Sequence, residues 1–544
     1  MTSLSVETQI DQEGVESSNA VGSQRRDTVA PWRQGRLAMH LESKGLLWSA
    51  LLIQALLSLS LSNTIFNDEA TYVIIGRAEI SHILHGTPIP DYSRFVSGAA
   101  NIYPILAAAI NYIGGIHLLR LASLAFMLLT TALVYAFTER IFGWGAATLG
   151  AGSFAVAGPI LFMGVLATHD AMTMFLISLA IWVGVRGSAY LGRRQLLWQV
   201  ASGAIGALAI LTTYSGLMFI PSVALTSLLY YLFTHNLRQA IVRIFAPFVL
   251  GFSIVALEAW RHMPGLVAGI FATTVTPFHD SASAIQILGD TLQYEGLWFL
   301  LGACGIVFIM RYRRSGPRVL LGAALLGSGL LSPLWHMHLG TAVSLQKHDG
   351  YGLLFVTPLV GIALSGGVEV WRRRMVAPLV GIMVILASLG NNVSTALYAA
   401  WPNSTSLIHL LRSHVTSGSA KFLVEEGAVP QYYFSNTTSP DQWISTYGYT
   451  IPRPGTSPLS GLAAFEAGIR DSNFALIALS NGPTKTLDLQ LEGLLAKDPS
   501  YETVAMLHYA TSFGPGTWRV WQLKTTARTQ MTRLGMREYR SHVD

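Results

Sequence analysis

The fold is decided by Leu46-Leu-Trp-Ser-Ala-Leu-Leu-Ile-Gln-Ala-Leu-Leu-Ser-Leu-Ser-Leu-Ser-Asn-Thr-Ile-Phe66, which is followed at once by Asn67-Asp-Glu-Ala-Thr-Tyr72. A helix that spans a bilayer needs roughly 20 apolar residues, so the first part is long enough to cross a membrane. Asp68 and Glu69 then stand where that helix meets water. Acidic residues at a membrane boundary are functional candidates, particularly where others recur on the same side.

The composition is that of a polytopic membrane protein. Of the 544 residues, 51% are hydrophobic and only 12% are charged, and the mean hydropathy is +0.45. The pI of about 9.3 does not indicate nucleic acid, because the basic residues cluster in short loops between apolar segments. The single cysteine, Cys304, excludes an intramolecular disulfide and cysteine-based zinc sites.

The apolar stretches predict a transmembrane domain over residues 45–398. Residues 1–44 are polar and predict a disordered segment without the apolar core and cleavage site of a signal peptide, so the first span is expected to remain as an anchor. The amphipathic stretch 102–116 predicts a partly inserted helix. About eleven spans are expected, at 46–66, 118–137, 146–166, 171–185, 196–213, 216–233, 241–260, 296–310, 319–334, 350–370 and 376–389.

The basic residues predict the orientation. They precede the first span and then recur in alternate loops, while the intervening loops carry few of them, so the N-terminus and the basic loops are expected in the cytoplasm. An odd number of spans then puts the C-terminal part outside. The basic loops hold Arg25, Arg26, Arg33, Arg36 and Lys44; Arg140; Arg186, Arg193 and Arg194; Arg238 and Arg243; Arg311, Arg313, Arg314 and Arg318; and Arg372, Arg373 and Arg374.

Titratable residues gather on the opposite, extracytoplasmic face of this map. The first loop, 67–101, carries Asp68, Glu69, Arg77 and Arg94, and the later loops on this side carry His169-Asp170, His279-Asp280 and Gln346-Lys-His-Asp349. A shared face is what a site built from these residues would require.

The composition changes after the last span and predicts a small extracytoplasmic α/β domain over 399–525. Residues 474–479 and 518–523 have the pattern of strands, and 484–496 has the pattern of an amphipathic helix. The tail 526–544 is basic. The chain has no Walker loop, which argues against an ATP-driven pump in this chain.

Each of these motifs also has a structural interpretation. Asn67 or Asp68 could cap a short interfacial helix with Glu69 complementing its dipole, and Asp170 could cap the fourth span. Lys347 could hold a phosphate at the bilayer surface or extend its side chain to the interface. His279-Asp280 and His336-x-His338 could suggest metal ligands, but a spacing of two residues is poor helix geometry for a shared metal.

Taken in order, these elements resemble the GT-C glycosyltransferases, and the protein O-mannosyltransferase and lipid A aminoarabinose transferase branch in particular (glycosyltransferase families 39 and 83). The resemblance extends over roughly residues 46–370. It rests on Asn67-Asp-Glu-Ala-Thr-Tyr72 with Gly76 and Gly86-Thr-Pro88, on Asn101-Ile-Tyr-Pro-Ile105, Leu119-Arg-Leu-Ala-Ser123, Ala167-Thr-His-Asp170 with 175–180, and Gly206-Ala-Leu-Ala-Ile-Leu-Thr-Thr-Tyr214, where Thr213 replaces a lysine, and on Lys347-His-Asp-Gly-Tyr351 through Pro358, where Gly350 stands in place of an arginine.

The resemblance implies an inverting transfer of a sugar from a polyprenyl-phosphate donor to an acceptor hydroxyl on the extracytoplasmic face. Asp68 would be the catalytic base, and Glu69 and Asp170 would orient the acceptor or help to bind a divalent metal ion. The acceptor, which could be a glycan, a lipid or a protein, and the sugar stay open. The donor phosphate would be bound by Lys347, His348, Arg94, Arg77 and Tyr351, and the pocket would be lined by Tyr72, His169 and Tyr103.

Two other functions compete with this interpretation. A secondary transporter would show interrupted spans in corresponding halves and ionisable residues near mid-membrane, whereas the charges here lie at span ends. A non-catalytic lipid-binding protein of the same fold is the other alternative.

Overall fold

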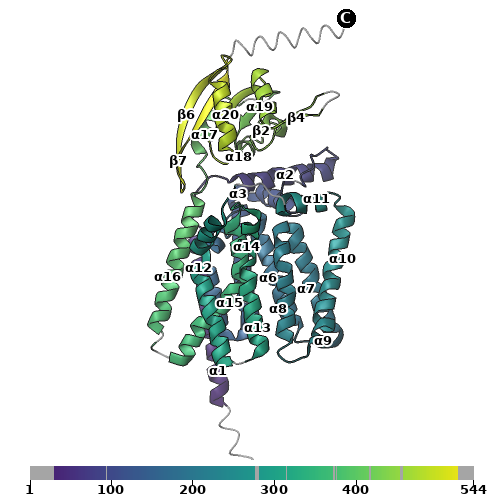
Figure 1. Ribbon diagram of the computed structural model, residues 1–544, viewed down its shortest axis with the longest axis vertical. Helices are drawn as coiled ribbons and strands as arrows, with labels where there is room; N and C mark the ends of the chain where they lie inside the picture. Colours follow the sequence, from purple (N-terminus) through teal and green to yellow (C-terminus); the bar gives the residue numbers. More distant parts are fainter. Residues whose placement is uncertain are drawn as a thin grey trace, which may run out of the picture.

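The computed structural model describes residues 30–93, 95–275, 281–313, 315–371, 374, 376–415, 418–453 and 457–524. A bundle of long helices carries a small sheet domain at one end (Figure 1). In the described residues, eight helical segments are long and apolar enough to cross a membrane: Tyr103–Phe142, His169–Gly187, Gly192–Thr212, Leu237–His262, Ala284–Tyr312, Gly316–Leu339, Leu345–Val370 and Val376–Tyr398.

The expected number of about eleven spans is therefore not confirmed. The first apolar helix, Lys44–Ser58, is shorter than these eight. The stretch 146–166 is divided into two helices at Gly158-Pro159, and 216–233 is divided at Ile220-Pro221. Proline lacks the N–H that an interior helix position requires, so each proline begins a new helix instead of continuing the previous one.

Most helices of the membrane part overlap a predicted apolar stretch, although their bounds differ from the predicted ones. They are α1 (Ala30–Ser58), α2 (Asn67–His85), α3 (Tyr103–Phe142), α4 (Trp144–Ala155), α5 (Gly158–Met163), α6 (His169–Gly187), α7 (Gly192–Thr212), α8 (Ile220–Tyr231), α9 (Leu237–Ala240), α10 (Ala246–His262), α11 (Leu266–Ile270), α12 (Ala284–Phe308), α13 (Gly316–Gly329), α14 (Leu331–Leu339), α15 (Leu345–Trp371) and α16 (Val376–Tyr398). A 3₁₀ turn, η1 (Tyr214–Phe219), precedes α8, and π-helical turns lie at Ile241–Phe245, Phe271–Val275 and Ile309–Arg313.

Two N-terminal predictions are refined by this structure. Helix α1 begins at Ala30, so the described part of the segment expected to be disordered, residues 30–44, has a helical backbone and consists largely of good helix formers. The predicted amphipathic helix 102–116 is the first part of α3, which kinks at Gly114-Gly115, where Gly115 has φ +65°. Residues 1–29 and the basic tail lie outside the described residues.

The C-terminal domain contains a mixed five-stranded sheet of order β2-β1-β5-β7-β6, in which β1 pairs in parallel with β2 and β5, and β7 is antiparallel to β5 and β6. Two further strands, β3 and β4, form an antiparallel pair. The predicted strand 474–479 is β5, and the predicted helix 484–496 is α20. The elements are α17 (Thr405–Arg412), β1 (Lys421–Val424), α18 (Ala428–Tyr433), β2 (Trp443–Ser445), β3 (Thr450–Ile451), β4 (Leu459–Ser460), α19 (Gly461–Arg470), β5 (Phe474–Leu479), α20 (Lys485–Leu495), β6 (Tyr501–Thr511) and β7 (Gly514–Leu523).

Strand alternation divides the core of this domain between the two faces of the sheet. Leu423 and Ile477 pack with Leu491 of α20 on one face. Phe422 and Leu476, one position away on the same strands, pack with α17 on the other.

The sheet domain is docked on the membrane part through α18, which packs on α2. Val429 of α18 belongs to the same buried cluster as Ile65 and Ala70. The hydroxyl of Tyr432 accepts a hydrogen bond of 2.9 Å from the side chain of Asn111, at the start of α3. These contacts hold the C-terminal domain over the loop that contains α2 and over the end of the bundle where α2 begins (Figure 1).

Candidate functional site

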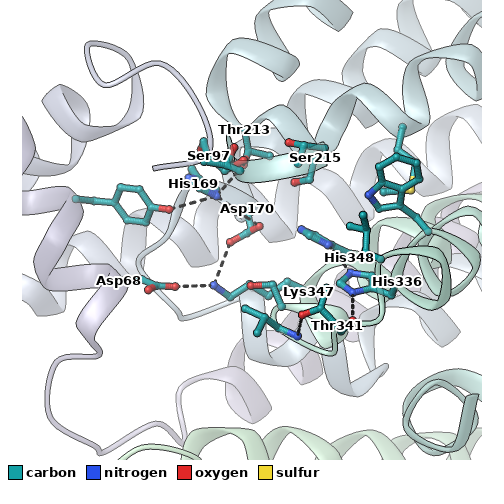
Figure 2. Close-up of a pocket in the computed structure, with 18 residues that line it drawn as sticks. Asp68, Ser97, His169, Asp170, Thr213, Ser215, His336, Thr341, Lys347 and His348 are labelled. Carbon is teal, nitrogen blue, oxygen red and sulfur yellow. Dashed lines mark hydrogen bonds and ion pairs between the residues drawn. The ribbon is translucent and has the colours of Figure 1, made fainter. Parts of the chain in front are cut away.

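A buried lysine joins two carboxylates from distant parts of the chain. Lys347 Nζ lies 3.0 Å from Asp68 Oδ2 and 3.7 Å from Asp170 Oδ2 (Figure 2). The side chain of Lys347 is 7% exposed and that of Asp170 is 2% exposed, whereas that of Asp68 is 40% exposed. A charge taken out of water needs a partner, and here one ammonium serves two carboxylates. Asp68 is the member that solvent or a substrate can reach.

Asp170 is held as an anion by donors on several sides. It lies in the first turn of α6, where the helix dipole favours negative charge. Thr168 Oγ1 donates to Asp170 Oδ2 at 2.8 Å, and the hydroxyl of Tyr351 donates to Oδ1 at 3.1 Å. The N-cap of α6 is Thr168, so the prediction that Asp170 caps this helix is wrong, and Asp170 instead belongs to the charged cluster. Its oxygens are occupied by protein donors, so it positions Lys347.

His169 and Tyr72 form the next part of the site. His169 Nε2 is 2.8 Å from Thr213 Oγ1 and 3.4 Å from the hydroxyl of Tyr72. The ring of Tyr72 packs edge-on against the rings of His169 and Tyr103. Burial, together with the charges of Asp68 and Asp170, raises the pKa of Tyr72 well above its usual range. Tyr72 is therefore a neutral phenol that can donate or accept a hydrogen bond.

A pair of histidines lies on the other side of Lys347. His336 Nδ1 is 2.7 Å from the carbonyl oxygen of Thr341, which can only accept, so this nitrogen carries a proton. His336 Nε2 is 2.8 Å from His348 Nδ1. When both rings are neutral, His348 donates from Nδ1 and offers the lone pair of Nε2 to a ligand. The sequence analysis considered His336 only together with His338, as a possible pair of metal ligands. In the structure His336 is hydrogen-bonded to His348 instead.

These groups surround a cavity of about 150 Å³. Figure 2 shows Ser97, Thr213 and Ser215 on the far side of Asp170 from Lys347. One end of the cavity is therefore charged and the other is rich in hydroxyls. Thr274 Oγ1 also belongs to the lining and is buried without a hydrogen-bond partner among the described residues. The hydroxyl lining is Ser97, Thr213, Ser215, Thr273, Thr274, Thr341 and Ser344.

Glu69 points away from this cavity and is fully buried. Its carboxylate receives two bonds from Arg120, of 3.0 and 2.7 Å, and one each from the backbone N–H groups of Ala167 and Phe66. Arg120 also donates to the carbonyl oxygens of Asn63 and Thr64. Glu69 therefore ties α2, α3 and the loop before α6 together, and it supplies the cap of α2 that was expected from Asn67 or Asp68. Arg120 belongs to the motif Leu119-Arg-Leu-Ala-Ser123, but its pairing with Glu69 was not predicted from the sequence.

Of the other residues predicted for the site, some contact the residues of the cavity and others lie elsewhere. Tyr351 reaches the site through Asp170, and Tyr103 supports the ring of Tyr72. Arg77 does not line the cavity: it donates to Asn111 Oδ1 at 3.0 Å and lies over the ring of Tyr432, where it helps to dock the C-terminal domain. Arg94 and the pair His279-Asp280 lie outside the described residues. The hydroxyl lining of the cavity was not predicted, because isolated serines and threonines have no distinctive pattern in a sequence.

The ammonium group of Lys347 lies between the carboxylates of Asp68 and Asp170. Within the described part of the chain, no three His, Cys, Asp or Glu side chains converge in the manner of a metal site. Asp68 and Asp170 instead share Lys347, which supplies positive charge at the place where a cation between them would lie.

Comparison with known proteins agrees with the arrangement of these elements. Residues 103–260 match the family model described as dolichyl-phosphate-mannose-protein mannosyltransferase. No curated protein matches the chain.

Solved structures extend the likeness to most of the chain. ArnT from Cupriavidus metallidurans in the apo state is 16% identical, with a TM-score of 0.54 over 89% of this chain and 98% of ArnT. The same ArnT bound to undecaprenyl phosphate is 14% identical, with a TM-score of 0.51 over 87% and 97% of the two chains. The oligosaccharyltransferase AglB from Archaeoglobus fulgidus, in complex with an inhibitory peptide and a dolichol-phosphate, is 14% identical, with a TM-score of 0.52 over 87% and 74%. The shared fold and the family-model match support a GT-C family like that of the protein mannosyltransferases and ArnT.

Proposed function

We propose that this GT-C glycosyltransferase, of the kind represented by the protein mannosyltransferases and ArnT, transfers one sugar from a polyprenyl-phosphate donor to an acceptor hydroxyl on the extracytoplasmic face. The observation that carries the proposal is the contact between the half-exposed carboxylate of Asp68 and the buried ammonium of Lys347, at 3.0 Å. A base for the acceptor and a cation for the leaving group are thereby adjacent. ArnT has been solved with undecaprenyl phosphate and AglB with a dolichol-phosphate, which supports a lipid-phosphate donor here.

The transfer needs one proton acceptor and one site for developing negative charge. Asp68 takes the proton of the acceptor hydroxyl as the acceptor oxygen forms a bond to the anomeric carbon of the sugar. The bond between that carbon and the phosphate oxygen breaks, and its electron pair leaves with the polyprenyl phosphate. Attack from the side opposite the leaving group inverts the anomeric centre. Lys347 stabilises the phosphate as its second negative charge develops.

Lys347 connects the two halves of this reaction. In the structure its ammonium is closest to Asp68 and is also near Asp170. When the donor phosphate enters, the ammonium gains a third anionic partner and its hold on Asp68 weakens. Asp68 then becomes available for the acceptor hydroxyl, while Asp170 keeps Lys347 in place. Base activation would therefore depend on the presence of the donor.

The hydroxyl-rich end of the cavity supports a sugar as the ligand. Serine and threonine side chains can each donate and accept hydrogen bonds, as sugar hydroxyls require. The cavity is small, at about 150 Å³. This space suits a single sugar ring better than an oligosaccharide.

The orientation of the protein is part of the same proposal. Many basic residues, among them Arg140, Arg186 and Arg243, belong to helix ends or turns of the membrane part away from the cavity. The positive-inside rule assigns that side to the cytoplasm. The cavity and the C-terminal domain would then face the outside.

The test is turnover of defined donors by the purified protein in vesicles. Polyprenyl phosphates that carry single sugars, including mannose, arabinose and 4-amino-4-deoxyarabinose, are supplied with a membrane extract as the source of acceptors. We expect release of free polyprenyl phosphate from at least one donor, with the sugar recovered on an acceptor. Tight donor binding with no turnover of any donor would instead identify a non-catalytic lipid-binding protein.

A further inference from the structure

The β6–β7 hairpin reaches from the C-terminal domain down to the end of a membrane span. The strands are joined by Ser512 and Phe513, and the N–H of Ser512 donates to the carbonyl oxygen of Ala399 at 2.8 Å. Ala399 directly follows Tyr398, the last residue of α16. Figure 1 shows the tip of the hairpin beside that end of α16. Since α16 is one of the helices that can cross a membrane, the tip lies at the level where the chain leaves the bilayer.

The chemistry of the tip suits a lipid interface. Phe513 is 86% exposed, more than any other large apolar side chain described in the C-terminal domain. The segment Tyr509-Ala-Thr-Ser-Phe-Gly-Pro-Gly-Thr517 contains no charged residue, so its entry into the interface leaves no charge without solvent. Aromatic side chains are enriched at the boundary between membrane and water. Gly514, at φ +121°, provides the turn that projects Phe513 at the end of the hairpin.

A second cavity, of about 650 Å³, lies behind this hairpin. Its lining includes Phe66, Trp401 and Tyr509, which are aromatic, and Glu426 and Arg519, which are charged. A cavity with both characters fits a polar head that carries sugar or phosphate groups and is attached to an apolar chain. Trp401, two residues beyond Ala399, places one wall of the cavity at the same membrane level as the hairpin tip.

The second cavity adjoins the catalytic one. The ring of Phe66 lies 5.0 Å from that of Trp401, and Lys347 Nζ lies 5.9 Å from the centre of the Phe66 ring. Phe66 caps α2, so Asp68 follows it in the first turn of the same helix. A hydroxyl on a molecule held in the second cavity therefore has a short route past Phe66 to Asp68.

We propose that the hairpin tip inserts into the headgroup layer of the outer leaflet, and that the cavity behind it receives the polar head of an acceptor anchored in the same leaflet. The second half rests on the proposed glycosyltransferase function, whereas the first does not. A hairpin at membrane level, an uncharged aromatic tip and an amphipathic cavity at the same height are all explained by an acceptor that arrives within the leaflet. The acceptor class is accordingly a membrane lipid or lipid-linked glycan.

The position of the tip can be measured without any enzyme activity. In a Cys304→Ser background, Phe513→Cys and the matched control Met506→Cys, which lies on β6 and is 60% exposed, are labelled with the fluorophore NBD. The proteins are placed in vesicles of phosphatidylethanolamine and phosphatidylglycerol, with or without a lipid that carries a shallow nitroxide quencher. We expect at least a twofold stronger quenching by the nitroxide lipid at 513 than at 506, and stronger quenching by aqueous iodide at 506. Equal iodide quenching at both positions, with no lipid quenching at 513, would overturn the membrane contact.

The acceptor class is tested with the labelled sugar of a donor that the protein consumes. The membrane extract is separated after the reaction into an organic-solvent phase and a protein residue. We expect the label in the lipid or lipid-linked glycan fraction, a several-fold slower transfer by Phe513→Ser, and an unchanged rate for Met506→Ser. Label confined to protein would refute a leaflet-borne acceptor while leaving the glycosyltransferase function intact. Failure of the proposed function would show differently, as donor that no form of the protein consumes.

Discussion

At the scale of single residues, the site depends on how charge is balanced around Lys347. Two carboxylates that are far apart in sequence share one ammonium, and one of them, Asp170, is buried. Removal of one partner from a buried ion pair leaves an uncompensated charge and costs about 3–5 kcal/mol of folding free energy. Stability and catalysis can therefore be separated by the choice of substitution.

Lys347→Gln is expected to abolish donor turnover and to lower the melting temperature, because Asp170 loses its cation. The double variant Lys347→Gln with Asp170→Asn should recover much of the stability, since no buried charge remains, but none of the activity. Thermal unfolding in detergent, followed by tryptophan fluorescence, together with release of polyprenyl phosphate, measures both effects. A double variant that melts no higher than the single variant would contradict this charge balance.

Glu69→Gln should act on folding rather than directly on the chemistry. Arg120 makes two hydrogen bonds to the Glu69 carboxylate and would be left as a buried cation, at a cost of about 3–5 kcal/mol. We expect a clear fall in the melting temperature. If Glu69→Gln instead melts like the unchanged protein and is inactive, then Glu69 belongs to the reaction and its structural role is wrong.

At the scale of elements, the junction between the C-terminal domain and the first loop contains a carboxyl group that responds to pH. Burial, the charge of Glu425 and the charge of Asp68 raise the pKa of Glu426 to about 8. The folded protein therefore keeps the proton of Glu426 at pH values where the unfolded chain has released it. The contribution to stability is complete below the ordinary glutamate pKa and is lost as the pH rises toward 8.

Glu426→Gln removes this titration and should make stability less dependent on pH between about 4.5 and 8. We expect a higher melting temperature for the variant than for the unchanged protein at pH 8, and little difference at pH 5. Glu466→Gln, on the exposed side of α19, is the matched control and should follow the unchanged protein at both pH values. Parallel pH profiles for Glu426→Gln and the unchanged protein would rule out the raised pKa.

Helices and strands could be predicted from the sequence where their formation depends on neighbouring residues. The strand Phe474–Leu479 was predicted with its observed bounds because its apolar run is short and bounded by polar residues. The spans were recognised from the length of the apolar stretches, but Pro159 and Pro221 divided two of them.

Most of the residues predicted for the site do converge on one cavity: Asp68, Asp170, Lys347, His348, His169 and Tyr72. The pairing of Glu69 with Arg120 and the position of Arg77 could not be predicted from the sequence, because each depends on contacts between distant parts of the chain.

At the scale of the whole molecule, the cavity and the sheet domain are both expected on the extracytoplasmic side of the membrane. Single cysteines in a Cys304→Ser background test this orientation. Asn236→Cys lies before α9, on the predicted cytoplasmic side, and Glu502→Cys lies exposed on β6, away from the hairpin tip. In intact spheroplasts, a membrane-impermeant maleimide should label position 502 directly and position 236 only after permeabilisation. The reverse pattern would contradict the orientation and the extracytoplasmic site with it.

The central claim is that Asp68 is the base of a glycosyl transfer, and Asp68→Asn tests it most directly. The matched control is Glu79→Gln, a carboxylate on the same helix that does not line the cavity. Both variants are purified, checked for an unchanged melting temperature, and supplied with the donor that the unchanged protein consumes. Loss of general-base catalysis predicts a fall in transfer rate of about 10²–10⁴-fold for Asp68→Asn, with Glu79→Gln unaffected. Transfer by folded Asp68→Asn at the rate of the unchanged protein would contradict the account.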